Sequence, residues 1–169
     1  ERRLGTMELL LTMPITNWQA IVGKFLASWL FLALALALTF PVIITVNYFG
    51  DPDNGIIASG YVGSLMLAGA YLAVSCMTSA LTRNQVISFI LSVMICLFLI
   101  LAGYTPVTDL LSRVASPVVV DIVAAFSVMT HFEGFQRGVL DTRDVVFFAS
   151  VIGFMLFTTG VIIRNQRAG

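Results

Sequence analysis

The sequence has 169 residues, of which 59% are hydrophobic and 11% are charged, and its formal net charge is zero. Soluble domains carry roughly 25% charged residues, so this composition excludes an ordinary soluble domain. The sequence also has no stripe of basic residues interleaved with aromatic ones, so it gives no sign of nucleic-acid binding.

The head of the chain, "ERRLGTMELLLTMPIT", is too short to cross a membrane but more apolar than a solvated tail. Thr6 is predicted to cap a short helix, and Glu8 lies in its first turn, where the helix dipole favours a carboxylate. After a proline, Thr16 and Gln19 form a capping box that starts a second helix. From these residues alone, the preferred interpretation of residues 1–20 is an amphipathic anchor at the membrane surface.

Four long apolar blocks follow the head. We predict that they are membrane-spanning helices at about residues 21–46, 56–81, 86–104 and 145–163. About 20 apolar residues are enough for a helix to cross a bilayer, so each block qualifies. The predicted fold is therefore an all-α membrane protein, with a single transmembrane domain over residues 1–169. Lys24, near the inner edge of the first span, is expected to snorkel to the headgroups and anchor that helix.

The first two predicted spans differ in character. Pro41 removes a backbone hydrogen bond from the outer half of the first span and is expected to kink it. The second span is rich in small residues, which let neighbouring helices approach closely. We expect it to lie at the centre of the bundle, and we prefer helix packing to a substrate-lining role. Its candidate packing residues are Gly60, Gly63, Ser64, Ala68 and Gly69.

The longest connection, about residues 105–142, contains the apolar segment "PVVVDIVAAFSV" at residues 117–128. Twelve residues make a helix of about 18 Å, which is short against a hydrocarbon core of about 30 Å. Asp121, near its middle, would cost ~3 kcal/mol at the bilayer centre. We therefore predict that this segment is re-entrant or interfacial and does not cross.

Chemistry-bearing residues are few. The candidate outer-loop residues are Asp121, His131, Glu133 and Arg137. His131 has Glu133 two positions away, but two potential ligands do not make a metal site, and an exposed loop histidine is the preferred interpretation. Cys76 and Cys96 lie inside spans and are interpreted as small reduced packing residues. Gly23-Lys24 lacks the other residues of a phosphate-binding loop. We predict no catalytic residue, no metal site and no cofactor bound by this chain.

The charged residues are sorted along the sequence. If the head, the turn at 82–85 and the tail share one side, that side holds six of the nine basic residues: Arg2, Arg3, Lys24, Arg83, Arg164 and Arg167. The other side holds seven of the nine acids: Asp51, Asp53, Asp109, Asp121, Glu133, Asp141 and Asp144. The positive-inside rule makes the first side cytoplasmic, so both ends of the chain are expected in the cytoplasm.

At the level of motifs, "ERRLGTMELLLTMPITNWQAIVGKFL" resembles the cytoplasmic loop of ABC type 2 permeases. The shared pattern reads Glu-Arg-Arg, Gly-Thr-x-Glu, Leu-Leu, Thr-x-Pro, and then Gly-Lys at the start of a span. "HFEGFQRGVLDTRDV", just before the last span, is similar to the gliding-motility-type branch of that family. The head motif is fairly specific, whereas the rest of the likeness is mostly hydropathy.

The resemblance implies a six-span subunit of which this chain covers spans three to six, with the first two absent. It also implies that the head is a cytoplasmic coupling helix resting on a separate ATPase subunit, and that short re-entrant helices precede the last span. By this resemblance the candidate ATPase contacts are Gly5, Thr6, Glu8, Leu9 and Leu10. ATP and Mg are then expected on the partner.

The sequence therefore favours the permease subunit of an ATP-driven transporter, with export as the expected direction. We expect it in a bacterial cytoplasmic (inner) membrane, paired with a second permease copy as a homodimer or related heterodimer. Movement of the coupling helix would tilt the first span and open a path between the two copies. The alternative is a four-span scaffold or assembly factor without transport. An intramembrane enzyme is disfavoured, because the spans hold no charged or histidine residue except Lys24 at an edge.

Overall fold

The computed structural model of the chain describes residues 17–113 and 116–168, and these residues form eight helices and no strand. Three apolar stretches are long enough to cross a membrane, or up to five if each of two bent helix pairs counts as one span. The prediction of an all-α membrane protein with about four spans is confirmed. The head and its five candidate ATPase contacts lie outside the described residues.

The first span is broken where the sequence predicts a kink. Helices α2 (Asn17–Ala37) and α3 (Phe40–Phe49) together make the 32-residue apolar stretch Trp18–Phe49. Pro41, at the start of α3, has no amide proton to donate, and its ring excludes a regular helix across the break. The Thr39 hydroxyl donates to the Leu36 carbonyl at 2.6 Å and accepts from the Tyr61 hydroxyl at 2.6 Å. The break is therefore fixed to the next helix.

The next helix, α4 (Asn54–Leu81), is central, as predicted for this span. It contacts α2 and three of the helices that follow it, α5, α8 and α9. Its N-terminus is capped by the Asp53 carboxylate, which accepts from the amides of Gly55 at 2.8 Å and Ile56 at 3.4 Å. A short turn ends at Asn84, which caps α5 (Gln85–Leu101) by accepting from the Val86 amide at 3.0 Å.

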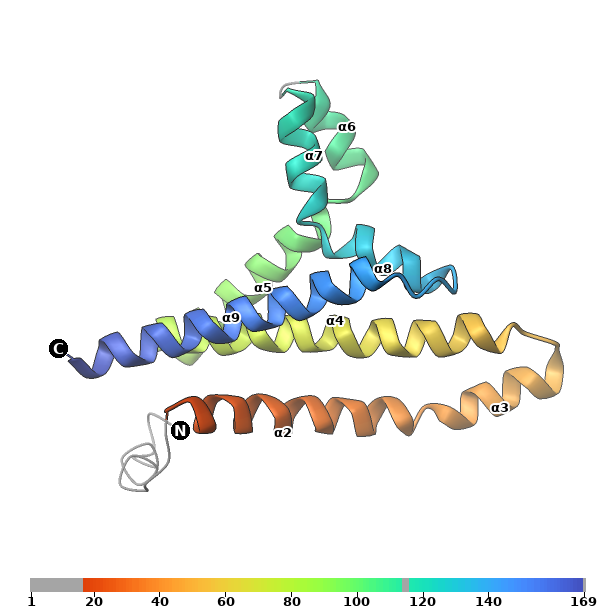
Figure 1. The fold of residues 1–169 in the computed structure, drawn as a ribbon, viewed down its shortest axis with the longest axis horizontal. Coiled ribbons are helices and arrows are strands. Elements are labelled where there is room, and N and C mark those ends of the chain that lie inside the picture. Colours follow the sequence, from red (N-terminus) through yellow and green to blue (C-terminus); the bar gives the residue numbers. More distant parts are fainter. Residues whose placement is uncertain (1–16, 114–115, 169) are drawn as a thin grey trace.

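The predicted outer loop is helical over most of its length. Helix α5 bends by 75° into α6 (Thr105–Ser112), and α7 (Pro117–Ala125) bends by 61° into α8 (Val128–Gln136). Helices α6 and α7 contact each other and stand away from the long helices as a hairpin (Figure 1). Helix α7 has nine residues, so it ends three residues before the apolar segment does.

The last helix, α9 (Thr142–Ala168), runs back along α4 (Figure 1). The start of α2, the turn between α4 and α5, and the end of α9 lie at one end of the bundle, and the turn between α3 and α4 lies at the other. The described core lies between α4, α8 and α9, around Ala70, Val128, Phe135 and Phe148. Most of the remaining apolar surface is exposed, as expected for helices that face lipid.

Candidate functional site

The junction between α8 and α9, which we call the elbow (residues 127–144), brings together polar side chains that bond to one another and to the ends of helices. Ser127 is fully buried and caps α8 by accepting from the amides of Met129 at 3.2 Å and Thr130 at 3.5 Å. A Cβ at Gly103 would overlap the Ser127 hydroxyl, so a glycine is needed where the chain leaves α5 beside this cap. The start of α8 is thereby fixed against the end of α5.

A glycine-terminated turn closes α8. Gly138 has a φ of +81°, in the left-handed region that favours glycine. Its amide donates to the Phe135 carbonyl at 3.2 Å, and the Val139 amide donates to the Gly134 carbonyl at 3.1 Å, which is the Schellman pattern of a helix end. The Asp141 carboxylate then accepts from the Arg143 amide at 2.9 Å at the start of α9. Local hydrogen bonds therefore fix both ends of this turn.

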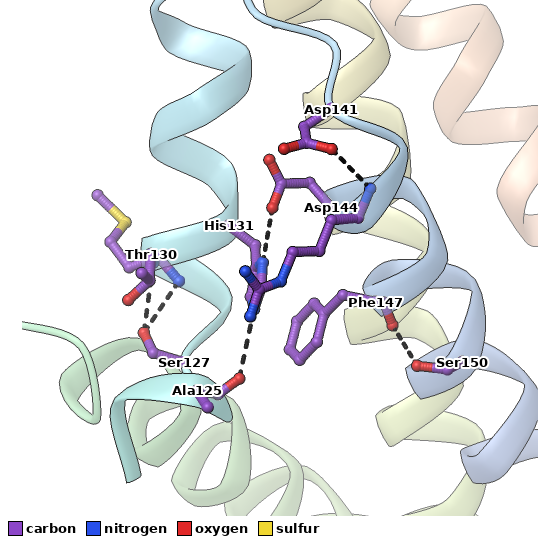
Figure 2. Close-up of polar contacts among 10 residues, drawn as sticks. Ala125, Ser127, Thr130, His131, Asp141, Asp144, Phe147 and Ser150 are labelled. Carbon is purple, nitrogen blue, oxygen red and sulfur yellow. Dashed lines mark hydrogen bonds and ion pairs between the residues drawn. The ribbon is translucent and has the colours of Figure 1, made fainter. Parts of the chain in front are cut away.

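His131 and Asp144 form a hydrogen-bonded pair inside the elbow. His131 Nδ1 lies 2.7 Å from Asp144 Oδ1, and each side chain is only 14% exposed. His131 Nε2 lies 3.3 Å from the Ala125 carbonyl oxygen, and the ring stacks on Phe147 with centroids 3.9 Å apart. Figure 2 shows the imidazole between the end of α7 and the first turn of α9. A neutral ring can donate to one of these oxygens and a protonated ring to both.

The interpretation of His131 as an exposed loop histidine is wrong, because the residue lies within α8 and is mostly covered. Asp144 is 13 residues further along the chain, and the turn after α8 brings it back. It lies in the first turn of α9, where the helix dipole stabilises a carboxylate. A Cβ on Gly134 would lie 2.7 Å from Asp144 Oδ2, so Gly134 leaves room for the carboxylate.

The other candidate outer residues do not join this pair. Glu133 and Arg137 form an exposed ion pair at 3.4 Å along α8, with side chains 50% and 77% exposed. Asp121 is exposed on α7. An exposed ion pair such as Glu133–Arg137 contributes little to the stability of the fold. Among the described residues no group of three His, Cys, Asp or Glu side chains is placed to hold a metal ion.

The candidate packing residues of α4 divide into two groups. Gly63 and Gly69 are buried at close approaches, since a Cβ would meet Phe135 at 2.6 Å in the first case and Trp29 and Ile152 at 3.0 Å in the second. Gly60, by contrast, faces open space, and Ser64 and Ala68 are only partly buried. Of the five candidate packing residues, Gly63 and Gly69 therefore lie on the face of α4 that contacts its neighbours most closely.

Two functional candidates were missed for different reasons. Asp144 gives no local signal, because its partner lies on another helix. Trp29 did give one: it lies inside a predicted span, away from the interfacial belt that tryptophan prefers, so its N–H needs an acceptor in the protein. In the structure Trp29 Nε1 donates to the Leu65 carbonyl at 2.9 Å.

Comparison with known proteins adds a family to this geometry. The sequence profile described as "ABC-2 family transporter protein" matches residues 1–117, which include the head and every helix from α2 to α6. No curated protein and no solved structure matches the chain.

Proposed function

The chain belongs to the ABC-2 family of transporter proteins and is a membrane permease subunit of an ABC transporter, and from this premise we propose that it forms half of an exporter driven by a separate ATPase subunit. The observation that carries the proposal is the family match, which covers more than half of the chain and includes the head. In the same proposal the chain works in a bacterial cytoplasmic membrane, with both of its ends in the cytoplasm, beside a second permease copy.

The head is the proposed coupling segment. The proposed contacts with the ATPase subunit are Gly5, Thr6, Glu8, Leu9 and Leu10. They lie among the 16 residues that precede α2 in the sequence, and in this proposal a force on the head passes along the chain to the first membrane helix. ATP and Mg bind the partner in this proposal, and the energy reaches the membrane through the contact between the two subunits.

The elbow lies toward the opposite end of the bundle from the start of α2 (Figure 1). We assign it a structural role there. The bends of 75° and 61° let the chain turn back before α9, which supports re-entrant helices over residues 105–142. The proposed topology has four crossings, formed by α2 with α3, by α4, by α5 and by α9.

The test is the Glu8→Ala variant, co-expressed with the ATPase subunit of the proposed transporter. A buried charge-assisted hydrogen bond across the subunit contact contributes about 1.5–3 kcal/mol, whereas a helix-dipole interaction alone contributes about 0.3–1 kcal/mol. We expect normal membrane insertion and a fall of roughly tenfold or more in co-purified ATPase or in permease-dependent ATP hydrolysis.

The matched control is Glu1→Ala, which removes a head carboxylate that is not among the proposed contacts. Unchanged ATPase association in Glu8→Ala would remove Glu8 from the contact. If the Thr6→Ala and Leu10→Ala variants also bind normally, the head is an interfacial anchor. A chain that never associates with an ATPase would instead be a membrane scaffold.

A further inference from the structure

The two buried side chains among the described side chains of α2 lie in the first half of that helix. Ile21 and Phe25 are 8% and 5% exposed, whereas Leu30, Phe31 and Leu34 are all more than 60% exposed. Helix α3 has no buried residue. The contacts that hold α2 to α4 and α9 therefore begin close to the head segment, and they extend to Trp29.

The first of these contacts joins Trp18 to α9. Gly160 is buried, and a Cβ built on it would lie 2.7 Å from Cη2 and 2.8 Å from Cζ2 of the Trp18 indole. The indole also stacks on Phe157, with ring centroids 6.0 Å apart. The glycine thus leaves a notch in α9 that receives one edge of the indole, while Trp18 as a whole stays 46% exposed.

The second contact joins Trp29 to α4 and α9. Its indole N–H donates to the Leu65 carbonyl at 2.9 Å, and a Cβ on Gly69 would lie 3.0 Å from that nitrogen. The same Cβ would lie 3.0 Å from Cδ1 of Ile152 on α9. Because Gly69 lacks a side chain, the indole can reach the carbonyl of Leu65, which lies within the helical backbone of α4. An unpaired N–H would be costly inside a membrane, so this bond fixes the ring position.

We propose that Trp18 and Trp29 are positioning residues of the transport cycle, which lock α2 into the Gly160 and Gly69 notches so that a push on the head moves α2, α4 and α9 as one body. This inference rests on the proposed function, because the push comes from the ATPase subunit. In this proposal the tilt that was expected of the first span is shared by α4 and α9. Two rigid rings that contact glycines on two different helices at short range resist sliding of α2 in a way that lipid-facing contacts do not.

The chain has two tryptophans, and both are notch residues. The experiment labels the permease with 5-fluorotryptophan and assembles it in lipid nanodiscs with unlabelled ATPase subunit. Fluorine resonances are recorded without nucleotide and after trapping with Mg-ATP and vanadate. In parallel a spin label at Val22→Cys, an exposed position on α2, measures the distance between the two permease copies.

The expected result is a nucleotide-dependent change in the inter-copy distance with both fluorine resonances unmoved. Gly160→Ala should shift the Trp18 resonance even without nucleotide, and it should reduce both the distance change and permease-dependent ATP hydrolysis at least fivefold. In the Gly160→Ala background, Trp18→Phe should restore the distance change and the ATP hydrolysis, because the smaller phenyl ring leaves room for the added methyl group. Rescue by a second substitution separates transmission from a general folding defect.

The matched controls are Gly153→Ala on α9 and Gly23→Ala on α2, where a Cβ has nothing within 4 Å. The proposal is overturned if Gly160→Ala behaves like Gly153→Ala, or if trapping shifts both tryptophan resonances while the inter-copy distance changes. If the inter-copy distance measured from the Val22→Cys label does not change with nucleotide in a permease without glycine or tryptophan substitutions, the proposed function is overturned. The proposed role of the two tryptophans is then overturned as well.

Discussion

At the scale of single residues, the His131–Asp144 pair is the contact whose loss should be felt most. Both side chains are 14% exposed and lie 2.7 Å apart, so removal of one leaves the other covered and without its partner. Hydrogen bonds to charged groups contribute about 1.5–3 kcal/mol. We therefore expect Asp144→Ala to lower the free energy of unfolding by that amount, measured by SDS-induced unfolding of the purified protein.

The control for this prediction is Glu133→Ala, which breaks the exposed pair with Arg137 on the same helix. Exposed pairs contribute about 0–1 kcal/mol, so this variant should unfold nearly like the wild type. Equal losses in the two variants would mean that the elbow does not depend on the His131–Asp144 contact.

The sequence could not have predicted this pair, although it contained both residues. Helical spacing identifies neighbours three or four positions apart, and His131 and Asp144 are separated by 13. They meet because Gly138 adopts a positive φ and turns the chain back. A glycine followed by an aspartate that caps the next helix predicts a turn there, but the angle between the two helices depends on packing against α4.

At the scale of helices, the proline rule located the break in the first span, whereas hydropathy did not give the number of short helices in the outer segment. Pro41 predicted the break after Ala37 because the loss of one amide proton acts locally. The segment 105–142 was predicted to be an outer loop with a re-entrant or interfacial helix at 117–128, and the structure has three helices there, α6, α7 and α8. Each of these three helices has nine residues or fewer, and such short helices are stabilised chiefly by tertiary contacts, which hydropathy does not report.

The same segment gives a prediction about the α6–α7 hairpin. Helix α7 has nine residues, about 14 Å of helix against a core of about 30 Å, so the hairpin cannot cross and must return to the side it left. Cysteines at Val118→Cys and Val139→Cys, which replace side chains 65% and 57% exposed, should both react with a membrane-impermeant thiol reagent from outside. Labelling of either position only from the cytoplasm would require a fifth crossing.

At the scale of the whole molecule, the hydropathy pattern predicted the fold class and the charge pattern predicted the orientation of the bundle. Long apolar blocks had to become helices that satisfy their own backbone, which fixed the fold class. The small residues of α4 predicted its central place in the bundle. They did not predict which face of α4 its neighbours would contact. Gly63 and Gly69 lie at close approaches while Gly60 does not, because the helix rotation is set by Phe135 and Trp29 on its neighbours. Residue spacing within one helix cannot contain that information.

The last prediction concerns the orientation of the bundle. The start of α2, the α4–α5 turn and the end of α9 share one end of the structure, and the α3–α4 turn lies at the other (Figure 1). The first end carries Arg83 and Arg164, and the second carries Asp51 and Asp53, so the positive-inside rule places the first end in the cytoplasm.

Asp51→Cys, in the α3–α4 turn, should therefore label in intact cells with a membrane-impermeant thiol reagent, and Asn84→Cys should label only after the membrane is opened. Both positions are exposed, so a difference between them reports the side of the membrane and not burial in the protein. The background protein carries Cys76→Ala and Cys96→Ala, which removes the two native thiols. Labelling of Asn84→Cys in intact cells would invert the topology, and the head could then not meet a cytoplasmic ATPase.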